Sequence, residues 1–383
     1  MGIYIFLISL TYLSFLYFYK RPSNIGYNIV FTVIASVICC GYMCGSDWRV
    51  YEYLYNSYTG LGEFGWHFLF VEPLYLLINI IGNELHLDFW IFYLIIKLLI
   101  YIKIVQVFKK YCPKEILMLA FTFYLGFWGL SNFIDPSFRN MIAVYFFLCS
   151  IDSLINRNFK KYVLWVIIAT LFHYSAIVLL LFYFILNKKY STKTIVVLFV
   201  IANIVLIKPE VLFKIASITL SFIPAISHKI ANYTLGEEAD TMGQGKILSM
   251  GYFVHIVLFV IILYFRNQIE SIKEGRLIFN MSILFIFIFR LGLTALIFSR
   301  FQLYIVYFYS ISVAYIIYSF INRDRLIVAS LIFAFSLAFT WNQMSNVFMV
   351  PYTNYFLYVG KNIPYEERCN YNYINSPYRD TRR

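Results

Sequence analysis

Runs of apolar residues, each near the length of a membrane-spanning helix, recur along this chain. A helix needs about 20 such residues to cross the hydrocarbon core of a bilayer. We predict spans at 2–19, 25–43, 88–108, 115–131, 138–155, 192–207, 248–265, 277–297, 301–321 and 326–341. With 61% hydrophobic and 13% charged residues, the chain has too little polar surface for a soluble fold. These features exclude disorder, a secreted disulfide scaffold and a soluble enzyme.

Short basic clusters separate the apolar runs and indicate their orientation. They are Lys20-Arg21, Lys109-Lys110 with Lys114, Arg157 with Lys160-Lys161, Lys188-Lys189 with Lys193, Arg266 with Lys273 and Arg276, and Arg323 with Arg325. Cytoplasmic connections of membrane proteins are enriched in Lys and Arg, so we place these clusters inside. The net charge of +12 is therefore explained by topology, and we expect no nucleic-acid partner.

The apolar run at 162–187 has a lysine pair near each end and allows two structures. One is a hairpin of two short helices that turns at Phe172-His173-Tyr174-Ser175. The other is a single long tilted helix with a buried His173. With the hairpin, the chain becomes an all-α polytopic membrane protein of about 12 transmembrane segments, with both termini outside.

Two outward segments, 44–87 and 208–247, are long enough to carry function and to contain helices lying along the membrane interface. We assign residues 1–360 to the membrane domain and expect 361–383 to be a polar, flexible tail. The six cysteines show no CxxC spacing, which indicates neither a zinc site nor a redox pair. We therefore expect no metal.

Three arginines lie inside or at the outer edge of predicted spans. Arg139 opens one span, Arg290 lies in the outer half of another, and Arg300 sits in the turn that follows it. A charge within a span costs roughly 2.5–3.5 kcal/mol on insertion scales, so each is a functional candidate. Because a guanidinium group stays charged and binds phosphate in a bidentate manner, the set predicts phosphate binding. The alternative is that the side chains extend to the lipid head groups.

The first outward segment contains two acidic candidates and a stripe of tyrosines. Asp47 begins a predicted helix with Tyr51, Tyr55 and Tyr58 on one face, and its carboxylate is either a helix cap or a base. The stripe is either an interfacial belt or a platform for sugar rings. Glu72 lies between apolar runs, where exposure to solvent does not account for it.

Several short motifs occur along the chain in an order that resembles a known family. They are Gly45-Ser46-Asp47 with Tyr51, Phe70-Val71-Glu72-Pro73-Leu74-Tyr75, Phe138-Arg139-Asn140-Met141-Ile142-Ala143, Phe172-His173-Tyr174-Ser175, Arg300-Phe301 with Tyr304, and Pro351-Tyr352. Together they resemble the EpsG-type polysaccharide polymerases, which are relatives of the Wzy O-antigen polymerases.

The resemblance implies a multi-pass glycosyltransferase of the bacterial inner membrane with a GT-C-like helical bundle and no need of metal or cofactor. Such enzymes transfer a growing glycan from its polyprenyl diphosphate carrier to the non-reducing end of another lipid-linked oligosaccharide repeat unit. The product is O-antigen, capsule or exopolysaccharide. The implied partners are the lipid-linked oligosaccharide, membrane lipids, a chain-length regulator and a flippase.

The residues fit this chemistry, which requires a base for the acceptor hydroxyl and cations for the diphosphate. The candidate bases are Asp47, Glu72 and His173. Substrate binding is assigned to Arg49, Tyr51, Arg139, Arg290, Arg300, Tyr304 and Tyr352.

Three other functions compete with a polymerase. A lipid-linked sugar flippase or transporter also places charges inside a helical bundle, but it often has repeated halves, which are not evident here. An O-antigen ligase shares the chemistry but usually has one larger outer loop with its own histidine and arginines. A membrane O-acyltransferase would rest on His173 alone.

Overall fold

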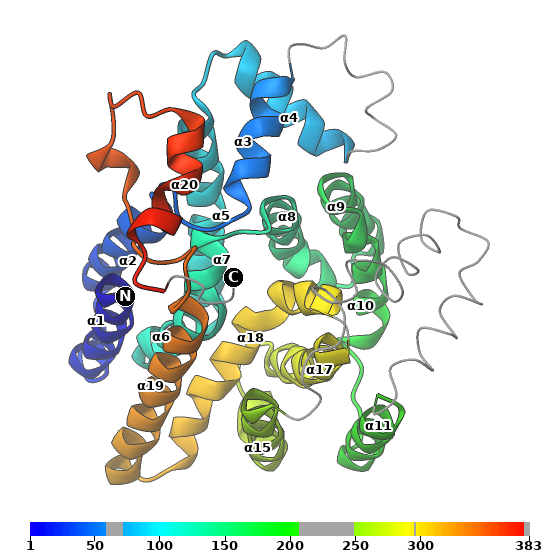
Figure 1. Ribbon diagram of the computed structural model, residues 1–383. Coiled ribbons are helices and arrows are strands. Elements are labelled where there is room, and N and C mark those ends of the chain that lie inside the picture. The colour runs from blue at the N-terminus through cyan, green and yellow to red at the C-terminus, as the bar shows by residue number, and fades with distance from the viewer. Residues whose placement is uncertain (59–71, 207–248, 295, 379–383) are drawn as a thin grey trace. The chain divides into compact units, whose positions relative to one another are not determined.

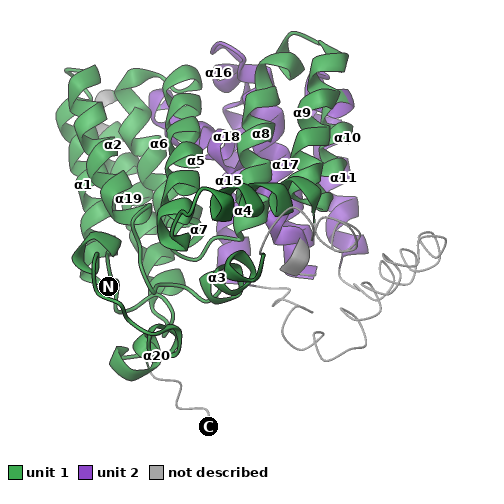
Figure 2. Ribbon diagram, turned by 90° about the horizontal axis from the view of Figure 1, so that it is seen from above, with its two compact units in different colours: residues 1–183, 320–383 green, residues 184–319 purple. Residues whose placement is uncertain are grey.

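The computed structural model describes residues 1–58, 72–206, 249–294 and 296–378. These ranges are helical and contain no strand, only an isolated bridge between Gly41 and Asn354. The chain divides into two compact units, which Figure 2 colours separately. Unit 1 comprises residues 1–183 and 320–383, and unit 2 comprises 184–319. The predicted outer segment 208–247 lies outside the described residues.

Unit 1 is a bundle of long helices with short helices at one end. The long ones are α1 (Gly2–Phe18), α2 (Asn24–Ile38), α5 (Phe89–Tyr111), α6 (Leu117–Tyr124) continued by the π-helical η4 (Leu125–Gly129) and α7 (Leu130–Ile134), α8 (Phe138–Ile155), α9 (Phe159–Phe172) and α19 (Asn322–Met344). The short ones are α3 (Trp48–Ser57), α4 (Pro73–Glu84) and α20 (Tyr365–Asn375). In Figure 1, α20 lies beside α3.

Contacts between helix ends show that the basic clusters of unit 1 gather at one end of the bundle. Tyr27 donates to the carbonyl of Lys114 (2.8 Å), Lys110 pairs with Asp152, and Arg325 donates to Tyr19 (3.2 Å). The helices alternate in direction, so the other end joins different segments. There the Tyr4 hydroxyl donates to the carbonyl of Met349 (2.6 Å), and the Tyr42 N–H to that of Thr353 (2.9 Å).

The apolar run at 162–187 forms the predicted hairpin, not one long helix. The chain leaves α9 at His173, whose φ of −157° and ψ of 111° are extended, and continues as the 3-10 helix η5 (Tyr174–Leu179) and α10 (Leu180–Ile185). The two arms run antiparallel, because the Tyr162 hydroxyl donates to the carbonyl of Leu179 (2.6 Å) and the Tyr162 and Tyr183 rings lie 5.4 Å apart.

Helices occupy every predicted span among the described residues, but they differ in length. Six helical segments are long and apolar enough to cross a membrane: Phe89–Tyr111, Lys114–Ile134, Phe138–Ile155, Gly275–Thr294, Phe298–Ser319 and Asp324–Met344. Several other apolar helices are shorter, such as α1 and α2. The chain is therefore an all-helical, multi-pass membrane protein, and the expected number of about 12 crossings is not confirmed.

Unit 2 is built around α17 (Gly275–Thr294) and α18 (Gln302–Tyr315), which the 3-10 helix η6 (Leu296–Phe301) connects. α11 (Thr192–Val205), α15 (Met250–Tyr264) and α16 (Arg266–Glu270) pack against α17. Buried polar contacts join the helices, since Ser282 and Ser312 share a hydrogen bond of 2.7 Å, and the Nδ1 of His255 lies 2.7 Å from the Tyr309 hydroxyl oxygen.

The end of unit 1 that carries the basic clusters should face the cytoplasm. We expect a reporter fused after Arg325 to score as cytoplasmic and one fused after Arg383 as external, because α19 crosses the membrane between them. Paired phosphatase and fluorescent-protein fusions, expressed in bacteria, measure on which side of the membrane each fusion point lies. Cytoplasmic signals from both fusions would contradict the predicted path by removing one crossing.

Candidate active site

Glu72, Arg139 and His173 meet in one hydrogen-bonded cluster at the end of unit 1 away from the basic clusters. The Arg139 Nη1 lies 2.6 Å from Glu72 Oε2, and the His173 Nδ1 lies 3.1 Å from Glu72 Oε1. Each residue is a separate candidate in the sequence. Folding brings Arg139 and His173 to Glu72 across 67 and 101 residues of chain, respectively. We refer to this group as the Glu72 cluster.

Local backbone structure positions the Glu72 carboxylate. Pro73 is the first residue of α4, and a proline favours an extended conformation in the residue before it. Glu72 accordingly has a ψ of 125° and occupies the N-cap position of α4. A carboxylate at that position also benefits from the positive end of the helix dipole.

His173 and Arg139 reach Glu72 from helix ends as well. His173 is the extended residue between α9 and η5, so its ring leaves the regular helix surface. Arg139 is in the first turn of α8, and its guanidinium lies 5.8 Å from the centre of the Tyr75 ring. The side chain of Arg139 is 37% exposed and that of His173 is 15% exposed, whereas that of Glu72 is 6% exposed. The two basic side chains are therefore the more accessible members of the cluster.

The electrostatics of the cluster keep Glu72 ionised. Burial raises the pKa of the Glu72 carboxyl, but the hydrogen bond from His173 and the charge of Arg139 outweigh burial and lower that pKa to about 2. A carboxylate with so low a pKa is a poor base. If Nδ1 of His173 carries the proton that Glu72 accepts, Nε2 becomes the proton acceptor of the ring. The cluster can thus orient a histidine base.

Asp47 lies in a turn that Asp135 holds. The Asp135 Oδ1 accepts from the N–H of Ser46 (2.8 Å) and of Asp47 (2.9 Å), and its Oδ2 from the Ser46 hydroxyl (2.9 Å). Gly45 is required there, because its φ is +87° and a Cβ would lie 2.5 Å from Asp135 Oδ1. Asp47 occupies the N-cap position directly before α3, as predicted, but its carboxylate makes no capping hydrogen bond to the helix. The prediction is therefore right about the position of Asp47 and wrong about the capping bond.

The tyrosine stripe on α3 faces the interior of unit 1. Tyr55 and Tyr58 are buried, and the Tyr55 hydroxyl donates to the carbonyl of Leu87 (2.9 Å). Tyr51 accepts from the N–H of Phe138 (3.1 Å), the residue before Arg139. The stripe is therefore neither the expected interfacial belt nor the expected sugar platform. A stripe of helical period defines one face of a helix, but it does not show whether that face is buried. Tyr51 supports the start of α8.

Arg49 and Tyr352 hold the C-terminal part of unit 1. The Arg49 guanidinium donates to the carbonyls of Gly45 (3.2 Å) and Cys369 (2.9 Å), the latter in α20. The Tyr352 hydroxyl donates to the carbonyl of Val37 (2.8 Å). The polar tail thus contains a helix that contacts the outer segment, which the sequence analysis did not predict.

Arg290, Arg300 and Tyr304 belong to unit 2. Arg290 is 2% exposed in α17, and it donates to Asn203 Oδ1 (3.2 Å) and to the carbonyl of Leu206 (2.7 Å). Among the described residues its Nη1 has no hydrogen-bond partner, and no carboxylate pairs with its charge. Arg300 is half-buried in η6, and Tyr304 is buried in α18. Within the described part of the chain, Arg290 therefore has a donor without a hydrogen-bond partner, and its guanidinium lies 5.5 Å from the centre of the Tyr252 ring.

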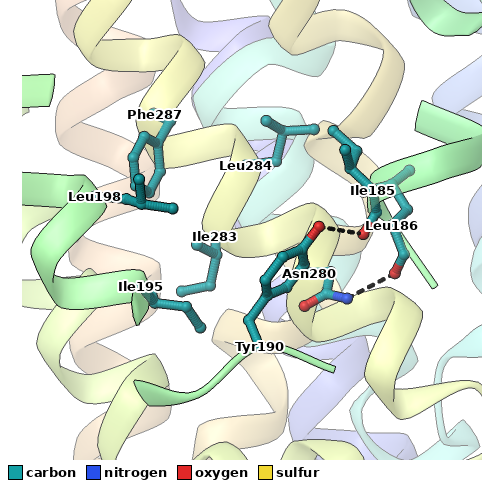
Figure 3. Close-up of a pocket in the computed structure, with 9 residues that line it drawn as sticks. All are labelled: Ile185, Leu186, Tyr190, Ile195, Leu198, Asn280, Ile283, Leu284 and Phe287. Atoms are coloured by element: carbon teal, nitrogen blue, oxygen red, sulfur yellow. Dashed lines mark hydrogen bonds between the residues drawn. The ribbon is translucent and has the colours of Figure 1, made fainter. Parts of the chain in front are cut away.

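Unit 2 also contains an apolar cavity of about 250 Å³, shown in Figure 3. Its lining is Ile185, Leu186, Tyr190, Ile195, Leu198, Asn280, Ile283, Leu284 and Phe287. The Tyr190 hydroxyl and the Asn280 amide donate to the carbonyls of Ile185 (3.0 Å) and Leu186 (2.6 Å), so the only two polar side chains of this lining are satisfied. The cavity provides no reactive group.

Lys97 is a buried charge that the sequence analysis missed. It lies within α5, is 0% exposed, and its Nζ has no hydrogen-bond partner among the described residues. The ammonium lies 4.9 Å from the centre of the Tyr93 ring, whose attraction offsets part of its desolvation. A charged residue inside a predicted span is a functional candidate, and this criterion applies to Lys97 as it does to Arg290.

The sequence was compared with known families and proteins. The model of the EpsG family matches residues 24–354, which include the whole Glu72 cluster. No curated protein and no solved structure matches the chain. Within the described residues, no three His, Cys, Asp or Glu side chains are grouped as metal ligands would be.

We expect Glu72→Gln to lower the free energy of unfolding at pH 7 by about 1.5–3 kcal/mol, the contribution of a hydrogen bond to a charged group. Because the folded-state pKa of Glu72 is below its ordinary value of 4.5, the carboxylate stabilises the fold above about pH 4.5, and this contribution is lost as the pH falls toward 2. Thermal unfolding in detergent from pH 7 to pH 3 measures the difference.

Glu84→Gln, at an exposed acid in the last turn of α4, is the matched control and should unfold like the unmodified protein. A stability difference for Glu72→Gln that is the same at pH 7 and pH 3 would contradict the charge-based account of the cluster.

Proposed function

The chain belongs to the EpsG family, a family of Wzy-like polysaccharide polymerases, and on this premise we propose that it polymerises polyprenyl diphosphate-linked repeat units at the outer face of the bacterial inner membrane. The Glu72 cluster is the observation that carries this proposal. It lies at the end of unit 1 opposite the basic clusters, which is the external end if those clusters are cytoplasmic.

His173 is the base in the proposed reaction. Its Nε2 takes the proton of the acceptor hydroxyl while the hydroxyl oxygen bonds to the anomeric carbon of the donor glycan. The bond between that carbon and the carrier diphosphate breaks, and the diphosphate leaves with the electron pair. Glu72 accepts from Nδ1, which fixes the ring and stabilises the imidazolium. Arg139 holds Glu72 in place.

Arginines stabilise the leaving diphosphate. Arg139 is the exposed cation of the Glu72 cluster, and it has guanidinium donors besides the Nη1 that binds Glu72. Independently of that cluster, Arg290 is the candidate of unit 2, because among the described residues its charge lacks a carboxylate partner and its Nη1 lacks a hydrogen-bond partner. Arg300 is the third candidate. With cations from the protein, the reaction is proposed to run without a metal.

We expect His173→Ala and Glu72→Gln to lose long polysaccharide chains, with rates lowered about 10²–10⁴-fold, as for loss of a general base. Polymer ladders on gels, from cells with matched membrane abundance of each variant, measure the loss. His86→Ala and Glu84→Gln alter exposed residues near α4 and are the controls. A wild-type ladder from His173→Ala would overturn its role as base.

The same assay in a deletion strain separates the candidate functions. Single repeat units on the surface support a polymerase, whereas a surface without repeat units indicates a flippase. Long chains that remain unattached indicate a ligase.

We expect Arg290→Lys to lower the polymerisation rate about 10²–10³-fold, since lysine retains the charge but loses the planar group that binds two phosphate oxygens. Arg276→Lys, at an exposed arginine in the first turn of the same helix, should be fully active. The ladder length at equal abundance is the measurement. Full-length polymer from Arg290→Lys would remove Arg290 from the diphosphate site.

A further inference from the structure

The outward face of α3 lines a cavity that the proposed reaction does not use. Tyr53, Asn56 and Ser57 are exposed and lie on one face of the helix at i, i+3 and i+4. Tyr365 and Arg368 lie three residues apart on α20 and face them. Together these five side chains line a cavity of about 250 Å³ in unit 1. We refer to it as the α3–α20 cavity.

Buried contacts beneath the α3–α20 cavity preform it. The Arg368 Nη2 lies 2.5 Å from Glu52 Oε1, and the side chains of this ion pair are 16% and 5% exposed. The Tyr365 hydroxyl donates to the carbonyl of Arg49 (3.0 Å). The two helices are therefore joined at two points, and a ligand would meet a lining that is already ordered.

The lining chemistry favours a saccharide. Tyrosine rings offer flat apolar surfaces to the C–H face of a sugar, while the Asn56 amide, the Ser57 hydroxyl and the Arg368 guanidinium supply polar groups for its hydroxyls. Glu52 already neutralises Arg368, so the cavity has no free charge for a phosphate or a uronic acid. Ligand pockets usually start at about 300 Å³, so the volume suits one ring better than a lipid chain.

We propose that the α3–α20 cavity binds one uncharged sugar ring of the growing glycan. The proposal rests on the proposed polymerase function and adds a glycan subsite to it. The location supports it, because Tyr51 on the inward face of α3 contacts Phe138, which precedes Arg139 of the Glu72 cluster. One short helix thus connects the cavity with the start of α8, which carries Arg139, and a glycan held at the cavity stays bound to the protein between successive transfers.

The test compares Tyr53→Ala and Asn56→Ala with Tyr17→Ala. Tyr53 is 67% exposed and Tyr17, at the opposite end of unit 1, is 74% exposed, so the two tyrosine changes remove similar surface without disturbing the core. The probe is the set of oligosaccharides released by partial hydrolysis of the polysaccharide that the same cells make. Their binding to the purified full chain in detergent is measured by saturation-transfer NMR and titration.

We expect Tyr53→Ala and Asn56→Ala each to weaken oligosaccharide binding about tenfold, the effect of roughly 1.4 kcal/mol. We also expect both to shorten the polymer ladder without abolishing the first transfer, and Tyr53→Trp to restore the length, because a larger ring still stacks. Tyr17→Ala should match the unmodified protein in both assays.

The outcomes separate the cavity from the reaction. Unchanged binding and unchanged ladders in both cavity variants would overturn the glycan subsite, even if His173→Ala abolishes polymer. Weakened binding in the cavity variants together with full polymer from His173→Ala would support the subsite and overturn the proposed base. Complete loss of all polymer in Tyr53→Ala at normal abundance would also overturn the subsite, since it would place Tyr53 in the reaction itself.

Discussion

The buried carboxylate of Glu72 requires both of its partners, and their contacts join helices at the end of unit 1 away from the basic clusters. An ionised carboxylate that loses its partners in the interior costs several kcal/mol, whereas one with both oxygens hydrogen-bonded is tolerated. Arg139 and His173 meet this need from α8 and from the α9 hairpin. The same contacts that keep Glu72 charged therefore fix three segments against one another. They engage Nδ1 of His173 and leave Nε2 outside the cluster.

Two other buried charges lack such compensation. Lys97 and Arg290 are within helices long enough to cross the membrane, and neither has a carboxylate partner in the part of the chain that the structure describes. The Tyr93 ring offsets part of the cost for Lys97, and carbonyl and amide oxygens do so for Arg290. A buried cation without a carboxylate partner costs stability, so both positions are places where the sequence departs from what packing alone favours.

Much of the fold follows from the sequence because membrane insertion depends on local properties. The apolar run 138–155 is helix α8 to the residue, and the turn at His173 lies where lysines at both ends of the run require it. Pairing is not local. Nothing near Glu72 indicates that its partners are 67 and 101 residues away. The helical period of the stripe from Tyr51 to Tyr58 defines one face of α3 but does not show that the interior of unit 1 covers that face. Nothing in the sequence near Asp135 indicates that its carboxylate binds the distant turn at Ser46 and Asp47.

α3 therefore has two faces with separate consequences. Its inward face is held in place, since Asp135 binds the N–H of Asp47 at the N-cap position and Tyr51 contacts the start of α8, which carries Arg139. Its outward face lines the α3–α20 cavity, which the ion pair between Glu52 and Arg368 holds in shape. Because a helix of 10 residues is too short to bend appreciably, the two faces keep a constant separation. A ligand bound at the cavity would therefore be held by the same short helix whose inward face supports the start of α8.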